Sequence, residues 1–232
     1  MKFVIATRNA HKAGEIRAIL GNRFRLLTLN DFPAAPTIVE DAATFAGNAT
    51  KKAVELARWI AEKHPTSNLP DPPPDFVLAD DSGLEVDALN GAPGVHSARF
   101  AAQDSVKSGN TPDADNNARL LRLLKNIPPE KRTARFHCVI ALTPVLSQKI
   151  EAASPVCYVD EFETQTELFD GICEGRIIFE PRGQNGFGYD PLFVPAGFER
   201  TFAELGDEVK NGLSHRARAL GKLHHYLSRL PS

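Results

Sequence analysis

The chain has 232 residues, of which 42% are hydrophobic and 24% are charged, a composition typical of a globular protein with a sizeable core. Its formal net charge is −2 at pH 7, so the overall charge gives no support to a nucleic-acid or membrane partner. No apolar run reaches the length of a transmembrane helix, and the N-terminal apolar run turns polar too early for a signal peptide. We therefore expect a cytoplasmic protein.

The first predicted elements are a strand at residues 2–7 (KFVIAT) and a helix at residues 11–20 (HKAGEIRAIL), joined by a polar loop. Thr7 or Asn9 is the expected helix cap. Backbone N–H groups at a helix start, together with Thr7, Asn9 and Lys12, form a candidate phosphate cradle. The segment lacks the Gly-rich spacing of a P-loop, so taken alone it also fits a simple capped helix.

A second helix is predicted at residues 44–64, after a proline-containing extended segment. Glu40 precedes this helix and Lys52 lies inside it. A carboxylate can hold Mg²⁺ and a lysine can neutralise a phosphate, although each residue alone is more often a surface charge. A proline-rich loop at residues 65–75 follows the helix.

The run FVLADDSGLEV at residues 76–86 places two adjacent carboxylates at the expected end of a buried strand. Neighbouring side chains of a strand point to opposite faces, so Asp80 and Asp81 cannot both face one ligand while the strand persists. We expect one of them to hold a turn at Ser82 and Gly83. The other is expected to point into a ligand site at the strand end.

The later elements alternate less regularly, and strands cluster after Arg132. We expect a turn-rich loop at 91–100, an amphipathic helix at 113–127, strands at 134–144, 154–163, 174–181 and 190–195, and a last helix at 214–230. This order favours a mixed α/β sheet. The cysteines at 138, 157 and 173 match no metal-site spacing and are interpreted as buried free thiols.

Two further segments carry candidate ligand contacts. In GQNGFGYDP (residues 183–191), glycines flank Phe187, which can stack on a base, and Asp190 can accept from a base N–H. A glycine-rich hairpin with a packed phenylalanine fits the same segment equally well. In KNGLSHRARAL, Lys210, His215 and Arg216 cluster at a helix start, where positive charge is unfavourable unless an anion or acceptor is present.

Together these stretches resemble the inosine triphosphate pyrophosphatase family, whose members act on noncanonical purine nucleoside triphosphates. The matching segments, in the order of the family, are ATRNAHKAGEI, TFAGNATKKA, LADDSGLEVDALNGAPGVHSARF, EGRIIFEPRGQNGFGYDPLF and SHRARAL. The resemblance implies a single domain over residues 1–232 with an elongated two-lobed α/β fold, a central mixed sheet flanked by helices, and an active cleft between the lobes. It also implies a homodimer.

The resemblance further implies Mg²⁺-dependent hydrolysis of ITP, dITP and XTP to the monophosphate and pyrophosphate. Glu40 and Asp81 match metal-binding carboxylates, and Asp81 also matches the proposed catalytic proton acceptor. The positions that match phosphate and base contacts are Thr7, Arg8, Asn9, Ala10, His11, Lys12, Lys52, Ser82, Phe187, Gly188, Tyr189, Asp190, Lys210, His215 and Arg216.

The chain departs from the family pattern at Gly47, where a glutamate is usual. With Thr44 that glutamate would form a capping box, so its loss is expected to weaken the helix start. The loops at 65–75 and 155–171 also look longer than usual.

Base choice is expected to depend on O6, which is an acceptor in hypoxanthine and xanthine, whereas adenine carries a donor there. Donors at His215, Arg216 or the backbone near Gly188 would favour O6. Two other functions fit parts of the sequence: a catalytically silent nucleotide-binding module and a Maf-like pyrophosphatase. Retention of Glu40, Lys52 and Asp81 argues against the first, and the SHR and GFGYD segments argue against the second.

Overall fold

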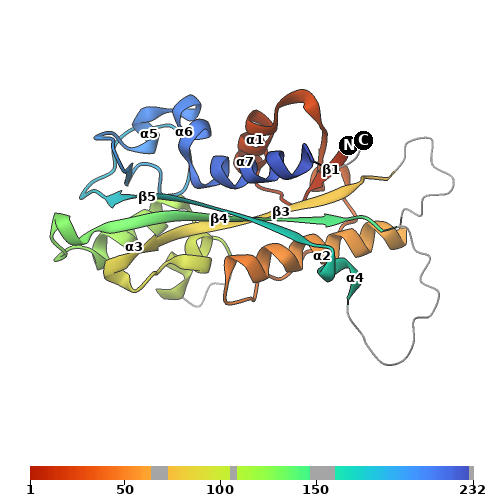
Figure 1. Ribbon diagram of the computed structural model, residues 1–232. Helices are drawn as coiled ribbons and strands as arrows, with labels where there is room; N and C mark the ends of the chain where they lie inside the picture. Colours follow the sequence, from red (N-terminus) through yellow and green to blue (C-terminus); the bar gives the residue numbers. More distant parts are fainter. Residues whose placement is uncertain (64–72, 105–108, 147–159, 230–232) are drawn as a thin grey trace. The chain divides into compact units, whose positions relative to one another are not determined.

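A computed structural model describes residues 1–63, 73–104, 109–146 and 160–229. In these ranges the strands form one six-stranded sheet with the order β2-β1-β3-β4-β5-β6 (Figure 1). Its strands are β1 (Lys2–Ile5), β2 (Arg25–Thr28), β3 (Phe76–Val86), β4 (Thr133–Pro144), β5 (Glu167–Ile177) and β6 (Phe193–Pro195). β1 pairs in parallel with β2 and β3, whereas β5 and β6 are antiparallel. The predicted mixed α/β sheet is confirmed.

Helices flank this sheet. They are α1 (Ala10–Leu20), α2 (Phe45–Lys63), α3 (Asp113–Leu123), α4 (Glu161–Thr164), α5 (Phe202–Leu205), α6 (Asp207–Leu213) and α7 (His215–Leu227). Asn9 caps α1, as one of the two alternatives predicted, because its side chain accepts from the backbone N–H of Lys12. None of the described helices combines the length and the apolar character that crossing a membrane requires.

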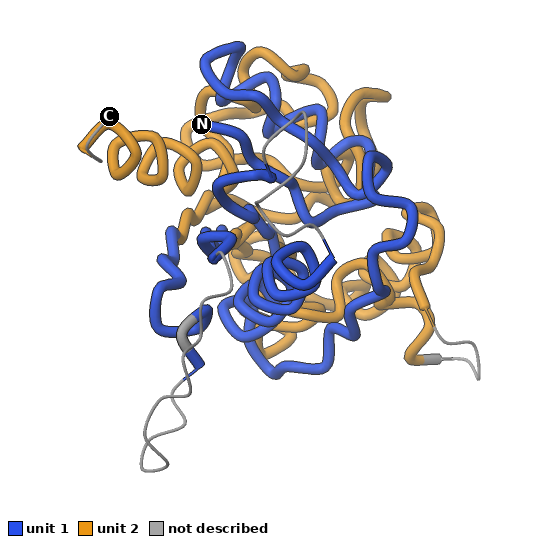
Figure 2. Tube along the Cα trace, turned by 90° about the vertical axis from the view of Figure 1, so that its right-hand side faces the viewer, with its two compact units in different colours: residues 1–81, 139–169 blue, residues 82–138, 170–232 orange. Residues whose placement is uncertain are grey.

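The chain divides into two compact units (Figure 2). Unit 1 contains residues 1–81 and 139–169, and unit 2 contains residues 82–138 and 170–232. The boundary lies inside β3, between Asp81 and Ser82, so these two neighbouring residues belong to different units. The assignment of one domain with two lobes stays a prediction.

The core of unit 1 contains the strands β1 and β3 and the apolar sides of α1 and α2. Residues 77–81 of β3 are buried without alternation, as expected for a central strand covered on both faces. All four elements contribute fully buried apolar side chains to this core. These include Val4, Ile5, Ile16, Ala49, Leu56, Ile60, Val77 and Leu78.

The core of unit 2 is rich in aromatic rings. Phe136 packs against Phe193 with ring centroids 4.7 Å apart, and Phe193 stacks on Phe202 at 5.4 Å. The ring of His215 stacks on the other side of this cluster, 4.8 Å from Phe136. The start of α7 is therefore anchored in the core. Cys138 and Cys173 are buried free thiols, as predicted, and Cys157 lies outside the described residues.

Four predictions about local structure were wrong or incomplete. β3 continues to Val86, so there is no turn at Ser82 and Gly83. Residues 161–164 form α4 rather than a strand, and the rest of the predicted strand at 154–163 falls mostly outside the described residues. β2 and the first half of β5 were not predicted. Lys210 lies within the short helix α6 instead of at the start of the last helix.

Candidate functional site

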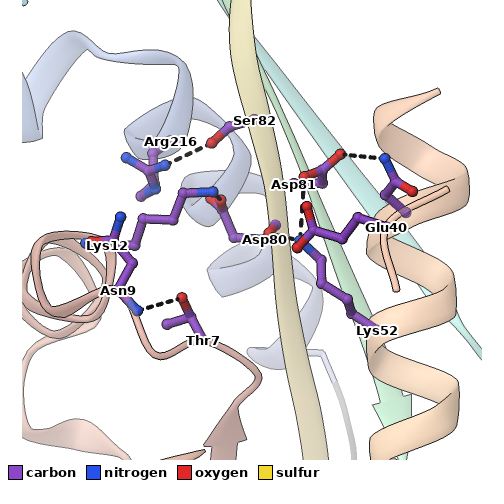
Figure 3. Close-up of polar contacts among 10 residues, drawn as sticks. Thr7, Asn9, Lys12, Glu40, Lys52, Asp80, Asp81, Ser82 and Arg216 are labelled. Carbon is purple, nitrogen blue, oxygen red and sulfur yellow. Dashed lines mark hydrogen bonds and ion pairs between the residues drawn. The ribbon is translucent and has the colours of Figure 1, made fainter. Parts of the chain in front are cut away.

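The connection between β1 and α1 holds residues 7–12 in a tight polar loop. The Thr7 hydroxyl accepts from the Asn9 N–H at 3.1 Å, and the Asn9 side chain accepts from the Lys12 N–H at 3.1 Å (Figure 3). Arg8 donates to the backbone carbonyl of Ala35. Residues 8–11 are exposed, so the N-terminal end of α1 is open to solvent, in the arrangement that favours an anion.

Asp80 belongs to the α1 side of β3. Its carboxylate is completely buried and lies 2.5 Å from the ammonium group of Lys12. The turn that one of the two aspartates was expected to hold is absent, because β3 continues through Ser82 and Gly83. A buried carboxylate needs a compensating charge, and Asp80 in turn fixes the position of the Lys12 side chain.

Asp81 belongs to the opposite, α2 side of β3 (Figure 3). The Lys52 ammonium group lies 3.2 Å from Asp81 Oδ1 and 3.0 Å from Glu40 Oε1, and it also donates to the backbone carbonyl of Asp80 at 2.7 Å. The predicted separation of the two aspartates onto opposite faces is confirmed. The structure also brings Glu40, Lys52 and Asp81 together, as their assignment to one metal and phosphate site requires.

Asn48 was not among the predicted site residues. Its side-chain N–H donates to Asp81 Oδ2 at 3.2 Å, while its oxygen accepts from the Ala42 N–H at 2.9 Å. Asn48 is fully buried. It therefore orients the Asp81 carboxylate and ties it to the segment that carries Glu40. The TFAGNATKKA match contains this asparagine, but only the structure shows its partner.

Burial and neighbouring charges act against each other on the pKa values of this cluster. Burial raises the pKa of Asp81 above its usual value, and the opposing effects of Lys52 and Lys12 do not cancel it. Burial also acts to lower the pKa of Lys52, but the charges of Asp81, Glu40 and Asp80 outweigh it and leave that pKa raised. Lys52 is therefore charged at neutral pH, and Asp81 is a stronger proton acceptor than an exposed aspartate.

A metal would have to rely on few protein ligands. Among the described residues there is no group of three or more His, Cys, Asp or Glu side chains suited to a metal ion. Glu40 and Asp81 supply two carboxylates that both face Lys52. Mg²⁺ is commonly bound by one or two carboxylates, with substrate phosphates and water completing its six oxygen ligands. The donor set fits Mg²⁺ that binds together with a phosphate-bearing substrate.

In unit 2, the start of α7 presents two predicted contacts. The Arg216 guanidinium donates to Ser82 Oγ at 2.9 Å and is 1% exposed. Ser214 caps the helix by accepting from the Ala217 N–H. His215 is held by its stack on Phe136. These side chains are thus positioned before any ligand binds.

The loop at residues 183–190 is organised around Asp190. The carboxylate of Asp190 lies 2.5 Å from the Lys210 ammonium group and accepts from the Phe187 N–H at 2.9 Å. Lys210 Nζ lies 4.5 Å from the centre of the Phe187 ring, and Arg216 Cζ lies 6.0 Å from it. The structure therefore brings Phe187, Asp190, Lys210 and Arg216 together within unit 2. Residues 183–191 consist of bends and turns within the connection between the antiparallel strands β5 and β6.

Two residues of the same loop are engaged with the protein itself. Tyr189 is buried, its hydroxyl donates to the Ser97 carbonyl at 2.9 Å, and burial raises the pKa of this phenol. The Gly188 N–H donates to Asp113 at 2.6 Å. Two of the predicted backbone donors at this loop, the N–H groups of Gly188 and Phe187, are therefore already used by Asp113 and Asp190.

The chain was compared with known proteins. A family model described as the Ham1 family matches residues 3–226. A dITP/XTP pyrophosphatase of Desulforamulus reducens is 42% identical over 231 residues, which is 99% of this chain and 97% of the relative. A second dITP/XTP pyrophosphatase, from Geobacillus kaustophilus, is 44% identical over 223 residues, 96% of this chain and 92% of the relative.

Solved structures agree with these matches. A HAM1 protein from Coxiella burnetii has a TM-score of 0.75 at 34% identity, covering 99% of this chain and 100% of that one. A nucleoside-triphosphatase / dITP/XTP pyrophosphatase from Mycobacterium abscessus has a TM-score of 0.65 at 37% identity, covering 96% and 98%. The family model and these relatives span nearly the whole length of the sequence, and the chain therefore belongs to the Ham1 family.

Proposed function

We propose that this protein is a nucleoside triphosphate pyrophosphohydrolase that converts ITP, dITP and XTP to the monophosphate and pyrophosphate, and so cleanses the nucleotide pool. The observation that carries the proposal is the cluster of buried Asn48, Lys52 and Asp81 with the partly exposed Glu40, a charged arrangement that a purely structural core rarely keeps. The names of the relatives from Desulforamulus reducens and Geobacillus kaustophilus support the choice of substrates.

We assign the triphosphate to the charged and polar residues of unit 1, called here the unit 1 cluster: Lys12, Glu40, Asn48, Lys52, Asp80 and Asp81. The N-terminal end of α1 over residues 7–12 supplies backbone N–H groups, and Lys12 and Lys52 supply positive charge. Such charges stabilise the negative charge that develops on a leaving pyrophosphate. Because both ammonium groups are already fixed by carboxylates, little reorganisation is needed when the substrate binds.

The proposed reaction is attack of water on the α-phosphorus. The water oxygen bonds to that phosphorus, the bond to the oxygen bridging to the β-phosphorus breaks, and its electron pair leaves with pyrophosphate. Asp81 holds the water by a hydrogen bond and receives its proton as a positioned general base. Glu40 and Asp81 would hold Mg²⁺, which when bound neutralises phosphate charge.

We assign the base to the unit 2 cluster, which consists of Phe187, Asp190, Lys210, His215 and Arg216. Phe187 offers a ring face for stacking, and Lys210, His215 and Arg216 offer donors for the O6 of hypoxanthine or xanthine. Adenine would place a donor against these donors, which costs it a buried hydrogen bond. Ser82, Gly188, Tyr189 and Asp190 would complete the wall of this site, Asp190 by holding Lys210.

A pyrophosphate-release assay tests the function. With Mg²⁺, ITP, dITP and XTP should each be hydrolysed at least roughly 100-fold more efficiently than ATP, and omission of Mg²⁺ should abolish release. Binding of ITP without release of pyrophosphate would instead identify a silent nucleotide-binding module. Equal hydrolysis of ATP would refute the assignment of base selectivity.

We also propose that the protein is a cytoplasmic homodimer, from its resemblance to the family. Light scattering coupled to size-exclusion chromatography should give about twice the mass of one 25.3 kDa chain. A monomeric mass across the concentrations used in the assay would contradict this part of the proposal.

A further inference from the structure

The first two turns of α3 hold one residue, Gly188, of the loop that carries Phe187. Asp113 Oδ2 accepts from the Gly188 N–H at 2.6 Å, and the Asn117 side chain donates to the Gly188 carbonyl at 3.0 Å. Asp113 and Asn117 are four residues apart and so share one side of the helix. Both polar groups of the Gly188 backbone are therefore held by α3, from more than 70 residues away in the sequence.

These two contacts fix the backbone on both sides of Gly188. Its N–H belongs to the peptide plane shared with Phe187, and its carbonyl belongs to the next plane. The plane before Phe187 is held separately, because the Phe187 N–H donates to Asp190. Gly188 has φ +64°, and Gly183 and Gly186 of the same loop also have positive φ. A loop this rich in glycine has unusual conformational freedom, so it needs such restraints.

Packing is incomplete on the side of the loop that faces α3. A cavity of about 450 Å³ lies between α3 and the loop, lined among others by Asn117, Leu121, Pro181, Phe187 and Gly188. Where a loop borders a cavity, few van der Waals contacts oppose its movement. The hydrogen bonds from Asp113 and Asn117 are thus the contacts by which α3 holds Gly188 beside this space.

The orientation of the Asn117 amide agrees with this role. Its side-chain oxygen is buried and accepts no hydrogen bond from the described residues, whereas its N–H group contacts Gly188. A flipped amide would place its oxygen against the Gly188 carbonyl, which is repulsive. The contact with Gly188 therefore determines how this side chain is oriented.

We propose that Asp113 and Asn117 are positioning residues for base recognition, which set the Phe187 ring against Lys210 by holding the peptide at Gly188. The proposal rests on the proposed function, since it assumes that Phe187 stacks on the base. Without the hydrogen bonds from Asp113 and Asn117, the loop relaxes toward the cavity and the Phe187 ring moves away from Lys210, whose ammonium group lies 4.5 Å from the ring centre. Base binding weakens, while the phosphate and metal groups of unit 1 are unchanged.

The first test compares Asp113→Ala with Asp115→Ala. Both variants remove an acidic residue from the first turn of α3, so any loss of helix stability is matched, but only Asp113 contacts Gly188. Loss of a charge-assisted hydrogen bond corresponds to roughly tenfold or more. Asp113→Ala should therefore raise the KM for ITP about tenfold with kcat changed less than about twofold, and should lower the preference for ITP over ATP.

Two more variants separate positioning from general damage. Asp113→Asn keeps an oxygen that can accept from the Gly188 N–H, so its KM for ITP should lie much closer to that of the wild type than to that of Asp113→Ala. Asn117→Asp keeps the shape but turns an acceptor toward the Gly188 carbonyl, so it should raise the KM as Asp113→Ala does. Asp115→Ala should match the wild type throughout.

A second readout does not depend on activity. Hydrogen–deuterium exchange at the Gly188 amide, measured without nucleotide, should accelerate in Asp113→Ala and stay unchanged in Asp115→Ala. Equal KM values for these two variants would overturn the proposal, even if exchange at Gly188 differs. A fall in kcat alone would also overturn it. If the wild type releases no pyrophosphate from any purine triphosphate, the proposed function fails. If exchange at the Gly188 amide is unchanged in Asp113→Ala, Asp113 does not restrain Gly188 and this proposal fails.

Discussion

Replacing Asp81 with asparagine should separate activity from stability. Asp81 is the one carboxylate in the unit 1 cluster that meets Lys52 through one oxygen and Asn48 through the other. The substitution keeps the shape of the side chain and an oxygen that can accept from Lys52, but it removes the negative charge and the proton acceptor. A positioned general base typically contributes roughly 10²- to 10⁴-fold to the rate, which corresponds to about 2.7 to 5.4 kcal/mol of the activation barrier.

The stability of this variant should change little. Burial raises the pKa of Asp81 in the folded state in spite of the nearby lysines. A carboxyl with a raised folded-state pKa stabilises the fold at a pH below its unfolded pKa, and this contribution disappears as the pH rises through the folded pKa. At neutral pH the ionised Asp81 is therefore itself unfavourable in the fold, but its charge also stabilises the charged Lys52. Because Glu40 still pairs with Lys52 in the variant, the two effects of asparagine should offset each other and the free energy of unfolding should change little.

Pyrophosphate release and thermal denaturation at pH 7 measure the two effects in the same samples. Asp41→Asn is the matched control, because the Asp41 carboxylate is 65% exposed and pairs only at the surface with Lys51, where such pairs contribute little. We expect kcat to fall at least about 100-fold in Asp81→Asn with a nearly unchanged melting temperature, and neither to change in Asp41→Asn. Near-normal turnover in Asp81→Asn would refute its catalytic role, and a clear change of melting temperature would refute the argument that the two effects offset each other.

Three further predictions concern the fold. Arg132 is 1% exposed, and its guanidinium donates to the carbonyls of Leu124, Ile127 and Ile178. In urea denaturation, Arg132→Leu should therefore lower the free energy of unfolding by roughly 3 kcal/mol. Arg135 is more exposed, and Arg135→Leu should change this free energy by less than about 1 kcal/mol. A Cβ added at Gly47 would lie 2.8 Å from the Cβ of Ala42. Gly47→Ala should therefore be destabilising in the same measurement, despite the gain of about 1 kcal/mol in helix propensity. Burial raises the pKa of Cys173 to about 11, so its thiolate is scarce at pH 8; peptide mapping after iodoacetamide treatment should show little modification of Cys173 until urea unfolds the chain.

The elements that the sequence predicted correctly are those fixed by local patterns. The start of α1 follows from the capping chemistry of Asn9, and β4 follows from a long run of β-forming residues. The separation of Asp80 from Asp81 needed only the two-residue period of a strand. Each of these properties depends on neighbours within a few positions.

The failures share a different cause, which is contact between distant segments. Ser82 and Gly83 have the composition of a turn, yet they continue β3 because the strand is buried in the sheet, and tertiary context overrides local propensity. Asn48 meets a carboxylate 33 positions away, and Asp113 meets Gly188 across 75 positions. Asparagine and aspartate at a helix start are common caps and surface residues, so nothing in their own neighbourhood distinguishes these two.

The resemblance located the charged groups of the site, and the structure explains how the fold tolerates them. Three candidate substrate-binding lysines each pair with a buried carboxylate: Lys12 with Asp80, Lys52 with Asp81, and Lys210 with Asp190. Removing both charges of a pair from water is seldom repaid in stability, so a fold selected for stability alone would place apolar side chains at these positions. The pairs instead hold each ammonium group in one orientation before substrate arrives. The entropy cost of fixing these donor side chains is therefore met when the chain folds. An incoming phosphate or base does not have to meet that cost again, which is the physical advantage of a preorganised site.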